Sequence, residues 1–516
     1  MQKPVNHLEN MFGRMGIHIS KRAYNQLELF VNSFPGNCYN MDPEYDRFLT
    51  LSDAATCLMY KEHVQRSEDT PLKIYYTDRK GMPVAIDITG KEGNVKMTDN
   101  SNFFCLGPSG SGKSFHMNSV VRQLHEQGTD VVMVDTGNSY EGLCEYLGGK
   151  YISYTEEKPI TMNPFKITKE EINIEKINFL KNLILQIWKG SEGIVTKTED
   201  RLIGQAIEEY YRSYFTGKID APLSFNSFFD FAVVRIPEII TENELKGIDT
   251  ADLNYQLRDF YKGGSHETTL NENMDSTLFD ETFIVFEIDA IKDDATLFPI
   301  VTLIIMDVFL QKMRLKKNRK VLVIEEAWKA IATPLMAEYI KYLYKTARKF
   351  WASVGVVTQE IQDIIGSEIV KEAIINNSDV VMLLDQSKFR ERFDNIKAIL
   401  GLTDVDCKKI FTINRLDNKE GRSFFREVFI RRGSTSGVYG VEESHECYMT
   451  YTTERAEKDA LKLYKSELGC SHQEAIERYC RDWDNSGIAA PLEFARRVYK
   501  AGHVLNLPAR NDKNNP

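Results

Sequence analysis

A glycine-rich octapeptide constrains the fold of this chain more than any other stretch of its sequence. Residues 107–114 read GPSGSGKS, which matches the phosphate-binding pattern G-x-x-x-x-G-K-[ST]. The apolar run Phe103–Leu106 precedes it and a helical run follows, as a strand–loop–helix unit requires. Glycines let the backbone N–H groups of such a loop turn inward around an anion at a helix N-terminus. The sequence therefore predicts a P-loop that binds the phosphates of a nucleotide.

The predicted nucleotide site consists of this loop and the residue after it. In the P-loop pattern the lysine reaches the β- and γ-phosphates, and the hydroxyl of the last residue binds Mg²⁺. Lys113 and Ser114 occupy those positions, so magnesium is an expected cofactor. The predicted binding residues are Gly107, Pro108, Ser109, Gly110, Ser111, Gly112, Lys113, Ser114 and Phe115.

Short apolar runs recur along the chain after residue 102, each followed by a loop and a helical stretch. Uninterrupted runs of this length are typical of parallel strands that are buried on both faces. Their alternation with helices predicts an α/β fold, a P-loop NTPase core with a parallel, doubly wound sheet. The predicted strands are Phe103–Leu106, Val131–Val134, Phe283–Ile288, Val321–Ile324, Val354–Val357 and Val380–Leu384.

Other segments differ from this core in character. We expect a small α+β N-terminal region with a helix near residues 20–31 and a hairpin of Ile74–Thr77 and Val84–Ile88. The expected segments are a partial N-terminal domain at 1–95, the first part of the ATPase core at 96–165, a mostly helical insertion at 166–275, the second part of the core at 276–450, and C-terminal helices at 451–516.

Capping boxes mark the starts of predicted helices in the insertion and in the C-terminal segment. Thr168 and Glu171 form one box, which predicts a helix that begins there and runs through Trp188. Ser471 and Glu474 form another. These local signals support helical structure on both sides of the second half of the core.

Two adjacent carboxylates follow one of the predicted central strands. Glu325 and Glu326 come directly after Val321–Ile324, so both face the crevice at the carboxyl ends of the strands, where a P-loop enzyme needs acids. We expect Glu325 to hold Mg²⁺ through water, and Glu326 to orient or deprotonate the attacking water. The alternative is that the pair only opens a helix, whose dipole favours acids there.

Two further strand ends carry candidate site residues. Gln359 follows Val354–Val357 and Thr358, where its neutral amide would sense the γ-phosphate or the attacking water. Asp135 ends another strand and either supports the site or caps a loop.

Phosphoryl transfer also needs positive charge, which a neighbouring subunit often supplies through an arginine. Arg348, beside Lys349, and Arg422, at the start of an arginine-rich strand segment, are the two candidates. A surface salt bridge is the alternative role for each. The sequence does not choose between them.

The overall charge limits the function classes. With 65 Lys+Arg against 75 Asp+Glu, the 516-residue chain has a net charge of −10, the wrong sign for a dedicated nucleic-acid coat. Residues 311–320 hold six basic residues in ten, which either contact DNA or a membrane or complement a helix dipole. Direct binding of DNA is thus open but not supported by the net charge.

Cysteine usage and hydropathy indicate a reducing compartment. The eight cysteines include no C-x-x-C pair, which argues against a zinc ribbon, a redox motif and a disulfide framework. The longest apolar stretch, 297–310, contains Asp307 and is shorter than the roughly 18 residues of a spanning helix. We expect a cytoplasmic protein.

These motifs, in this order, resemble those of the RecA-like motor ATPases of type IV secretion and conjugative transfer, the TraC/TraG-type group of the FtsK/HerA superfamily. The resemblance covers about residues 100–450. The P-loop is shared by many NTPases, whereas Asn-Pro-Phe, the acidic pair before Ala-Trp and the later Thr-Gln are together more specific. The matching pieces are Asn102, Gly107–Ser114, Asp135 with Gly137, Asn163–Phe165, Val321–Trp328, Arg348–Lys349, Thr358–Gln359, Asn376–Ser378 and Gly421–Arg422.

The resemblance implies a RecA-like core that hydrolyses ATP to ADP and phosphate in a Mg²⁺-dependent reaction. It implies a homo-oligomer, a hexameric ring, that works with secretion-channel and coupling proteins on the inner face of the bacterial inner membrane, with peripheral membrane association. The implied catalytic residues are Lys113, Glu326 and Gln359, with Arg348 or Arg422 acting across the ring interface, and the implied metal residues are Ser114 and Glu325.

The sequence departs from the family pattern at two points. The family usually has aspartate where this chain has Glu325, and the extra methylene shifts the distance to the metal. Family members also carry a larger domain before the motor, whereas 106 residues precede Gly107 here. We therefore expect the chain to begin within that domain.

The leading hypothesis is an ATP-driven motor that energises channel assembly or transport in conjugation. Two rival hypotheses stay open. A DNA-pumping translocase of the same superfamily would be strongly stimulated by DNA, and a nucleotide-gated scaffold would need ATP binding but only slow hydrolysis.

Overall fold

The computed structural model divides into two compact units, residues 1–64 and residues 65–516. Helices α1 (Gln2–Arg14) and α2 (Gln26–Asn32) belong to the first unit. The start of the predicted helix at 20–31 lies partly outside the described residues. The structure describes residues 2–14, 24, 26–37, 41, 51–52, 66–90, 97–155, 157–190, 193–273, 276–326, 334–359, 374–416, 422 and 424–508.

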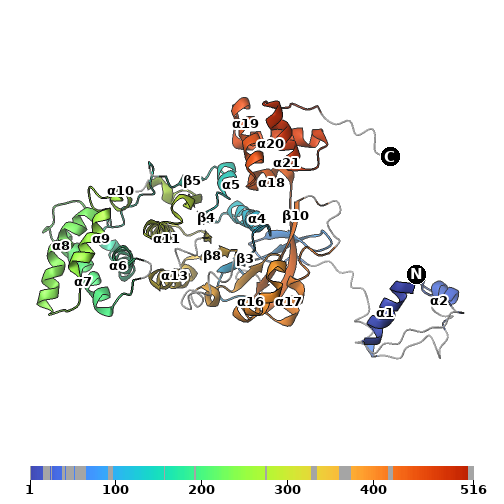
Figure 1. Ribbon diagram of the computed structural model, residues 1–516, viewed down its shortest axis with the longest axis horizontal. Helices are drawn as coiled ribbons and strands as arrows, with labels where there is room; N and C mark the ends of the chain where they lie inside the picture. Colours follow the sequence, from blue (N-terminus) through green and yellow to red (C-terminus); the bar gives the residue numbers. More distant parts are fainter. Residues whose placement is uncertain are drawn as a thin grey trace. The chain divides into compact units, whose positions relative to one another are not determined.

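The second unit is built on an eleven-stranded sheet within the described residues, whose strand order is β2-β1-β11-β10-β9-β3-β8-β7-β4-β6-β5. Figure 1 labels strands β3, β4, β5, β8 and β10 of this sheet. Neighbours from β9 to β5 pair in parallel. The strands are β1 (Ile74–Thr77), β2 (Pro83–Ile86), β3 (Phe103–Leu106), β4 (Asp130–Asp135), β5 (Lys150–Ser153), β6 (Phe283–Glu287), β7 (Lys320–Glu325), β8 (Ala352–Thr358), β9 (Val380–Leu383), β10 (Phe424–Arg432) and β11 (Thr435–Glu443).

The parallel part confirms the predicted strands and the α/β fold class. Strands β3, β4, β6, β7, β8 and β9 are buried along their whole length, because helices cover both faces. The sequence did not predict β5 at the edge, since its residues are half-exposed and form no apolar run.

The other part of the sheet is antiparallel. Strand β10 pairs antiparallel with β9 and β11, and β11 pairs with β1 of the β1–β2 hairpin. The hairpin exists where the sequence predicts it. It is, however, continuous with the large sheet, because Thr77 of β1 lies opposite Gly440 of β11.

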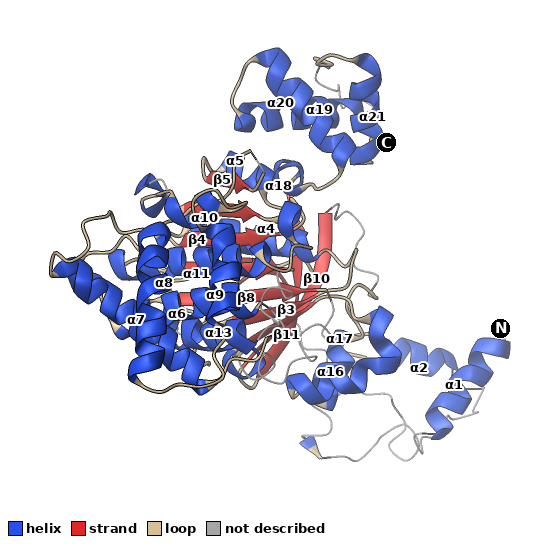
Figure 2. Ribbon diagram, turned by 60° about the vertical axis from the view of Figure 1, so that its left-hand side comes forward, coloured by secondary structure: helices blue, strands red, loops and turns tan. Residues whose placement is uncertain are grey.

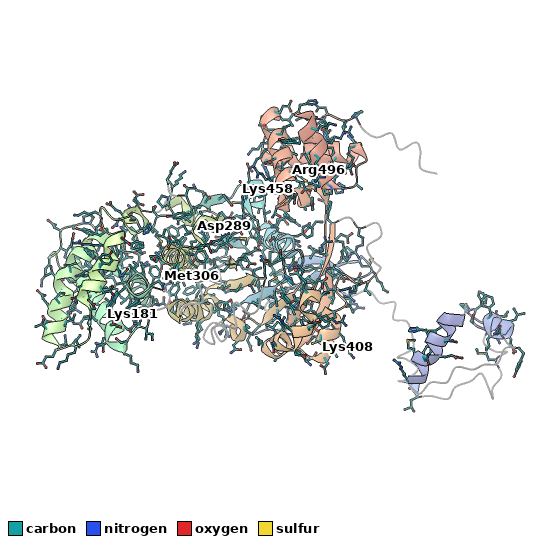
Figure 3. The ribbon with its side chains drawn as sticks, in the orientation of Figure 1. Lys181, Asp289, Met306, Lys408, Lys458 and Arg496 are labelled. Atoms are coloured by element: carbon teal, nitrogen blue, oxygen red, sulfur yellow. The ribbon has the colours of Figure 1, made fainter. Side chains whose placement is uncertain are left out.

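Alternate residues of the central strands face two different cores. Phe104 and Leu106 of β3 point to one core, which helices of the insertion complete, while Phe103 and Cys105 point to the other. Helices α6, α11 and α13 belong to the first face, and α4 packs against β4, β1 and β11 on the second (Figure 2). Met306 of α11, labelled in Figure 3, is fully buried in the first core.

The stretch 166–275 is helical, as expected, but its first helix starts later than the sequence predicts. The capping box of Thr168 and Glu171 is present, yet it caps a single 3-10 turn. The α-helix begins after Asn173, whose side chain accepts a hydrogen bond from the Lys176 N–H. The helices are α6 (Ile174–Lys189), α7 (Lys197–Phe215), α8 (Phe225–Glu242), α9 (Thr250–Leu257) and α10 (Glu267–Asn271).

The remaining helices surround the sheet and form the C-terminal segment. No helix among the described residues is both long and apolar enough to cross a membrane. The α-helices are α4 (Lys113–Glu126), α5 (Glu141–Tyr146), α11 (Leu297–Leu315), α13 (Pro334–Ala347), α16 (Phe393–Leu400), α17 (Asp404–Ile410), α18 (His445–Tyr451), α19 (Arg455–Leu468), α20 (His472–Ser486) and α21 (Pro491–Ala501). Turns of 3-10 helix lie at Lys169–Glu171, Arg258–Phe260, Ser276–Phe279, Asp289–Ile291, Arg348–Phe350, Ile375–Asn377 and Ser387–Arg392.

The C-terminal helices have a small core of their own around Trp483 and Phe494. The capping box of Ser471 and Glu474 opens α20 as predicted. Polar contacts join this segment to the sheet unit: Lys458 of α19, labelled in Figure 3, donates a 3.0 Å hydrogen bond to the carbonyl of Asn138.

Candidate functional site

The strand order brings the predicted site residues to one edge of the sheet. From β3 the neighbours run β8, β7 and β4, and all four strands are parallel. Their carboxyl ends therefore present the P-loop, Gln359, the acidic pair and Asp135 in that spatial order. This edge is where ligands bind in open α/β sheets.

The P-loop leaves β3 with its backbone held against β8, because the Gly107 N–H donates to the Thr358 carbonyl at 3.1 Å. Gly110 and Gly112 have φ angles of 79° and 91°, which side-chain-bearing residues rarely adopt. A Cβ on Gly112 would also lie 3.2 Å from Arg426 Cγ. Helix α4 starts at Lys113 without a side-chain cap, which leaves its positive end directed at the loop.

Lys113 makes ion pairs with both predicted carboxylates. Its Nζ lies 3.1 Å from Glu325 Oε1 and also contacts Glu326 Oε1. Only 7% of the lysine side chain is exposed, against 21% for Glu326. Burial lowers the pKa of the Lys113 amine, but the two carboxylates outweigh burial and hold that pKa above its ordinary value. The lysine is therefore charged and held at the mouth of the P-loop.

Two hydroxyl groups hold the Glu325 carboxylate in place. Ser114 Oγ donates to Glu325 Oε1 at 3.2 Å, and the Tyr140 hydroxyl donates to Oε2. Tyr140 is fully buried, and burial together with the Glu325 charge raises its pKa well above the ordinary value. Its hydroxyl thus remains a hydrogen-bond donor. The sequence did not single out Tyr140, because no local pattern marks it.

Glu326 has a left-handed backbone conformation, with φ at 56°. Its N–H donates to the Val357 carbonyl of β8 at 3.0 Å, so pairing with the neighbouring strand fixes this conformation. Non-glycine residues in this region are uncommon and often occur at functional sites. Gln359 leaves the end of β8 and lines the same cavity as Glu326. The Ala327–Trp328 part of the motif lies outside the described residues.

Asp135 caps a loop and also lines the cavity, so the structure contains both features that the sequence left open. Its Oδ1 accepts the Gly137 N–H at 3.1 Å and its Oδ2 accepts the Ser139 N–H at 2.6 Å. Burial first, and then the nearby Glu325 and Glu287 charges, raise the pKa of Asp135 well above its usual range. The loop that Asp135 orders leads directly to Tyr140.

These side chains surround a cavity of about 540 Å³, a size typical of nucleotide and other small-molecule sites. Of the predicted binding residues, Gly107 and Ser111 do not line it. Residues that the sequence did not assign line it as well, among them Phe424, Phe425, Arg426, Tyr448 and Tyr451. The predicted residues that line it are Pro108, Ser109, Gly110, Gly112, Lys113, Ser114, Phe115, Asp135, Glu325, Glu326 and Gln359.

Neither predicted arginine lies in the cavity of its own chain. Arg348 is exposed in the turn before β8, at the opposite edge of the sheet. Arg422 pairs with Glu442 at 2.7 Å and its guanidinium lies 3.6 Å from the centre of the Phe425 ring. Arg426, in the same strand segment, does line the cavity. A role of Arg348 or Arg422 across a subunit interface stays a prediction.

The basic run at 311–320 is partly buried. Lys312 and Lys320 are inaccessible to solvent. Lys312 binds the carbonyls of Phe279 and Glu281 and lies 3.2 Å from Asp130 Oδ2, and Lys320 donates to the Lys316 and Asn318 carbonyls. These two lysines satisfy backbone oxygens near the end of α11, which supports the helix-end interpretation of the run over contact with DNA.

Comparison with known families gives one match over most of the chain. The family described as the TraG P-loop domain matches residues 73–483. This range includes the whole sheet from β1 to β11, the helical insertion and part of the C-terminal helices.

Individual relatives match a shorter part. Protein TraC of Escherichia coli K12 is 24% identical over 298 residues, 56% of this chain and 32% of TraC. The type IV secretion system protein virB4 of Bartonella henselae is 25% identical over 282 residues, 54% of this chain and 33% of its own length. The aligned region thus spans about a third of each relative.

A solved structure has the same fold. VirB4 of Thermoanaerobacter pseudethanolicus aligns with a TM-score of 0.54 at 20% identity, covering 73% of this chain and 98% of that one. At this identity the likeness concerns the fold alone.

Proposed function

The chain belongs to the TraG P-loop domain family, and on that premise we propose that it is an ATP-hydrolysing motor of a type IV secretion or conjugative transfer system. The observation that carries this proposal is the contact of Lys113 with both Glu325 and Glu326 at the mouth of the P-loop. A lysine, two carboxylates and a helix N-terminus in one cavity are the groups that phosphoryl transfer from a nucleotide requires.

The ion pairs of Lys113 define what ATP binding has to change. The lysine is paired with two acids, and the incoming β- and γ-phosphates would compete with those acids for its charge. We propose that Lys113 moves to the phosphates and releases Glu326, the more exposed acid. The freed carboxylate then orients or deprotonates the attacking water, and Gln359 positions that water from the adjacent strand end.

The oxygen atoms of Ser114 and Glu325 fit a magnesium site. Mg²⁺ prefers oxygen ligands and is usually bound by one or two protein groups together with phosphate oxygens. Among the described residues no group of three or more His, Cys, Asp or Glu side chains could hold a metal ion. When bound with ATP, Mg²⁺ would neutralise charge on the phosphates.

Tyr140 would adapt this site to glutamate in place of aspartate. By fixing Oε2 of the longer Glu325 side chain, it leaves Oε1 beside Ser114. Tyr140→Phe is then expected to raise the Mg²⁺ concentration needed for half-maximal turnover several-fold, while the KM for ATP at saturating Mg²⁺ stays within about twofold. An equal change in both would contradict this positioning role.

We further propose that the active form is a ring of six subunits. The ring would work on the cytoplasmic face of the bacterial inner membrane. An arginine from one subunit, Arg348 or Arg422, would complete the site of its neighbour. Secretion-channel and coupling proteins would be its partners. The chain aligns with only about a third of each curated relative. The ring, the membrane location and the partners are therefore proposed for the whole assembly and not for this chain alone.

The first experiment measures ATP turnover by the purified chain across a hundredfold range of protein concentration, with and without single- and double-stranded DNA. Lys113→Ala is the blank. Specific activity that rises with concentration and is insensitive to DNA is the expected result for a secretion motor. Several-fold stimulation by DNA would favour a DNA translocase, and no turnover above the blank would reject hydrolysis.

Glu326→Gln tests the chemical role of the second acid. The amide keeps the shape of the side chain but does not accept a proton, so turnover should fall by about 10²–10⁴-fold. ATP binding should persist or strengthen, because Lys113 loses one competing charge. Conjugation that survives this change and is abolished by Lys113→Ala would instead support a nucleotide-gated scaffold.

A further inference from the structure

The nucleotide cavity has an aromatic side in addition to its charged side. Phe424 and Phe425 at the start of β10 and Tyr448 and Tyr451 of α18 line it together with the P-loop. The rings of Phe424 and Tyr448 are stacked, with centroids 4.0 Å apart and planes inclined by 18°. We call these four residues the aromatic wall.

The wall is connected to the P-loop helix. Tyr451 packs edge-to-face on Phe115, the residue after Ser114, at a centroid distance of 5.9 Å. Phe425 and Tyr451 are buried, whereas Phe424 and Tyr448 are partly accessible. A nucleotide whose phosphates lie in the P-loop would therefore have aromatic surface within the same cavity for its remaining part.

Both tyrosine hydroxyls of the wall already have protein partners. The Tyr448 hydroxyl donates to Glu457 Oε1 at 3.2 Å, and the Tyr451 hydroxyl accepts a hydrogen bond from Arg122 Nε. These contacts hold each ring by its polar end. What the two tyrosines offer a ligand is consequently the apolar ring surface and not a hydrogen-bonding group.

The stacked pair is also supported from the C-terminal helices. The ring centroid of Phe424 lies 5.9 Å from that of Trp483 in α20 and 5.4 Å from that of His445 in α18. Aromatic side chains packed in this way lose little further freedom when a planar ligand is added. The wall is thus an ordered surface before any ligand binds.

We propose that the aromatic wall binds the base of the nucleotide by stacking, and that Phe424 and Tyr448 set the base specificity. This inference rests on the proposed ATPase function. Stacking depends on the area of the planar base and not on its hydrogen-bond pattern, so every base has a suitable face but purines offer more area. The site should therefore prefer purine over pyrimidine nucleotides, with little discrimination between adenine and guanine.

The test compares a ligand that has a base with one that lacks it. Binding of Mg·ATP and of inorganic tripolyphosphate is measured by titration calorimetry on the full chain and on Phe424→Leu. The expected result is that the variant binds ATP about tenfold or more weakly, while its affinity for tripolyphosphate changes less than twofold. Unchanged tripolyphosphate binding also proves that the P-loop has remained folded.

The control is Tyr499→Leu, an aromatic-to-leucine change at a 75% exposed position of α21 outside the cavity. It should bind both ligands as the unmodified chain does. Tyr448→Leu is the second variant if Phe424→Leu does not fold, and the same split between ATP and tripolyphosphate is expected.

Three results would overturn the inference while leaving the proposed function intact. ATP affinity unchanged in Phe424→Leu and Tyr448→Leu, or an equal loss for both ligands, would exclude base stacking on the wall. A preference for ATP over GTP greater than about a hundredfold would show hydrogen-bond readout of the base instead. Failure of the unmodified chain to bind either ligand would reject the ATPase function itself.

Discussion

Buried lysines at the two ends of the parallel strands have opposite electrostatic surroundings. Strand β7 connects the two ends: it begins at Lys320 and ends at Glu325, which pairs with Lys113. Carboxylates hold the pKa of Lys113 above its ordinary value. At the amino end of β7 burial lowers the pKa of Lys312 and Lys320, whose partners are mainly backbone carbonyls, and the nearby Asp130 does not offset it.

On the proposed function, this difference separates a lysine that binds phosphate from lysines that stabilise the fold. Carboxylate partners can be exchanged for phosphate when a ligand enters, whereas carbonyls fixed in a helix end and a loop are permanent parts of the fold. A lysine paired with acids beside a cavity can thus bind an incoming anion. A lysine among carbonyls instead donates hydrogen bonds to backbone oxygens that have no helical partner.

The largest effect should come from Lys113→Ala. Phosphate release is expected to fall by about a thousandfold, because the main positive charge on the transferred phosphoryl group is lost. The chain should stay folded, since Ser114 and Tyr140 still hold Glu325. Circular dichroism and a phosphate-release assay measure the two outcomes. If Lys113→Ala retained a tenth of the activity, the lysine paired with acids would not be the main group that stabilises the transferred phosphoryl group.

Lys312→Met should have the opposite profile, with lost stability and normal catalysis. Two carbonyls and the buried Asp130 would lose their cationic partner, a change that costs about 3–5 kcal/mol in the free energy of unfolding. Urea titration measures the loss, and turnover per folded molecule should be unchanged. Lys317→Met, an exposed lysine of the same run, is the control and should unfold as the unmodified chain does.

A buried histidine sharpens the comparison, because no carboxylate among the described residues pairs with it. Burial lowers the pKa of His116, three residues after Lys113, to about 4, and Tyr76 is its hydroxyl neighbour. The unfolded chain therefore binds more protons than the folded one between about pH 6.5 and pH 4. The free energy of unfolding should therefore decrease as the pH is lowered through this window, by about 3 kcal/mol from this group.

The measurement is urea unfolding at pH 7 and pH 4 of the unmodified chain and of His116→Gln. The glutamine variant lacks the titrating group, so the difference in stability between the two chains should shrink or change sign at pH 4. Parallel pH curves for both chains would mean that folding does not lower the pKa of His116.

The smallest effect is expected for Lys320→Met. Among the described residues its hydrogen-bond partners are carbonyls, and Asp130 keeps Lys312 as its counter-charge. The cost should be about 1–3 kcal/mol, below that of Lys312→Met in the same urea assay. A loss equal to or larger than that of Lys312 would show that Asp130 is not what distinguishes the two sites.

Much of the fold and the charged half of the site could be predicted from the sequence, because their signals are local. A buried strand leaves an apolar run, and a P-loop has fixed spacing. Glu325, Glu326 and Gln359 could be found because each follows such a run directly. Strand β5 could not, since Lys150–Ser153 is an edge strand with half-exposed side chains and no run of this kind.

The residues that the sequence missed reach the site through long-range contacts. Tyr140 lies 185 positions from Glu325, and Arg426 meets Gly112 only because β10 passes beside the P-loop. The aromatic wall combines β10 with α18, which no sequence spacing relates to the P-loop. Arg426 is missed for the same reason: Arg422 and Arg426 are in one segment, but only the fold shows that Arg426 lines the cavity of its own chain.

The position of β3 in the sheet has a consequence for synthesis. Its neighbours are β8 and β9, and Asn102 beside β3 binds the backbone of Val354, which is 252 residues further along the chain. At about 5–20 residues per second, a ribosome needs roughly 13–50 seconds to add that length. The nascent P-loop strand waits unpaired for this time, so cellular chaperones are expected to protect it until β8 emerges.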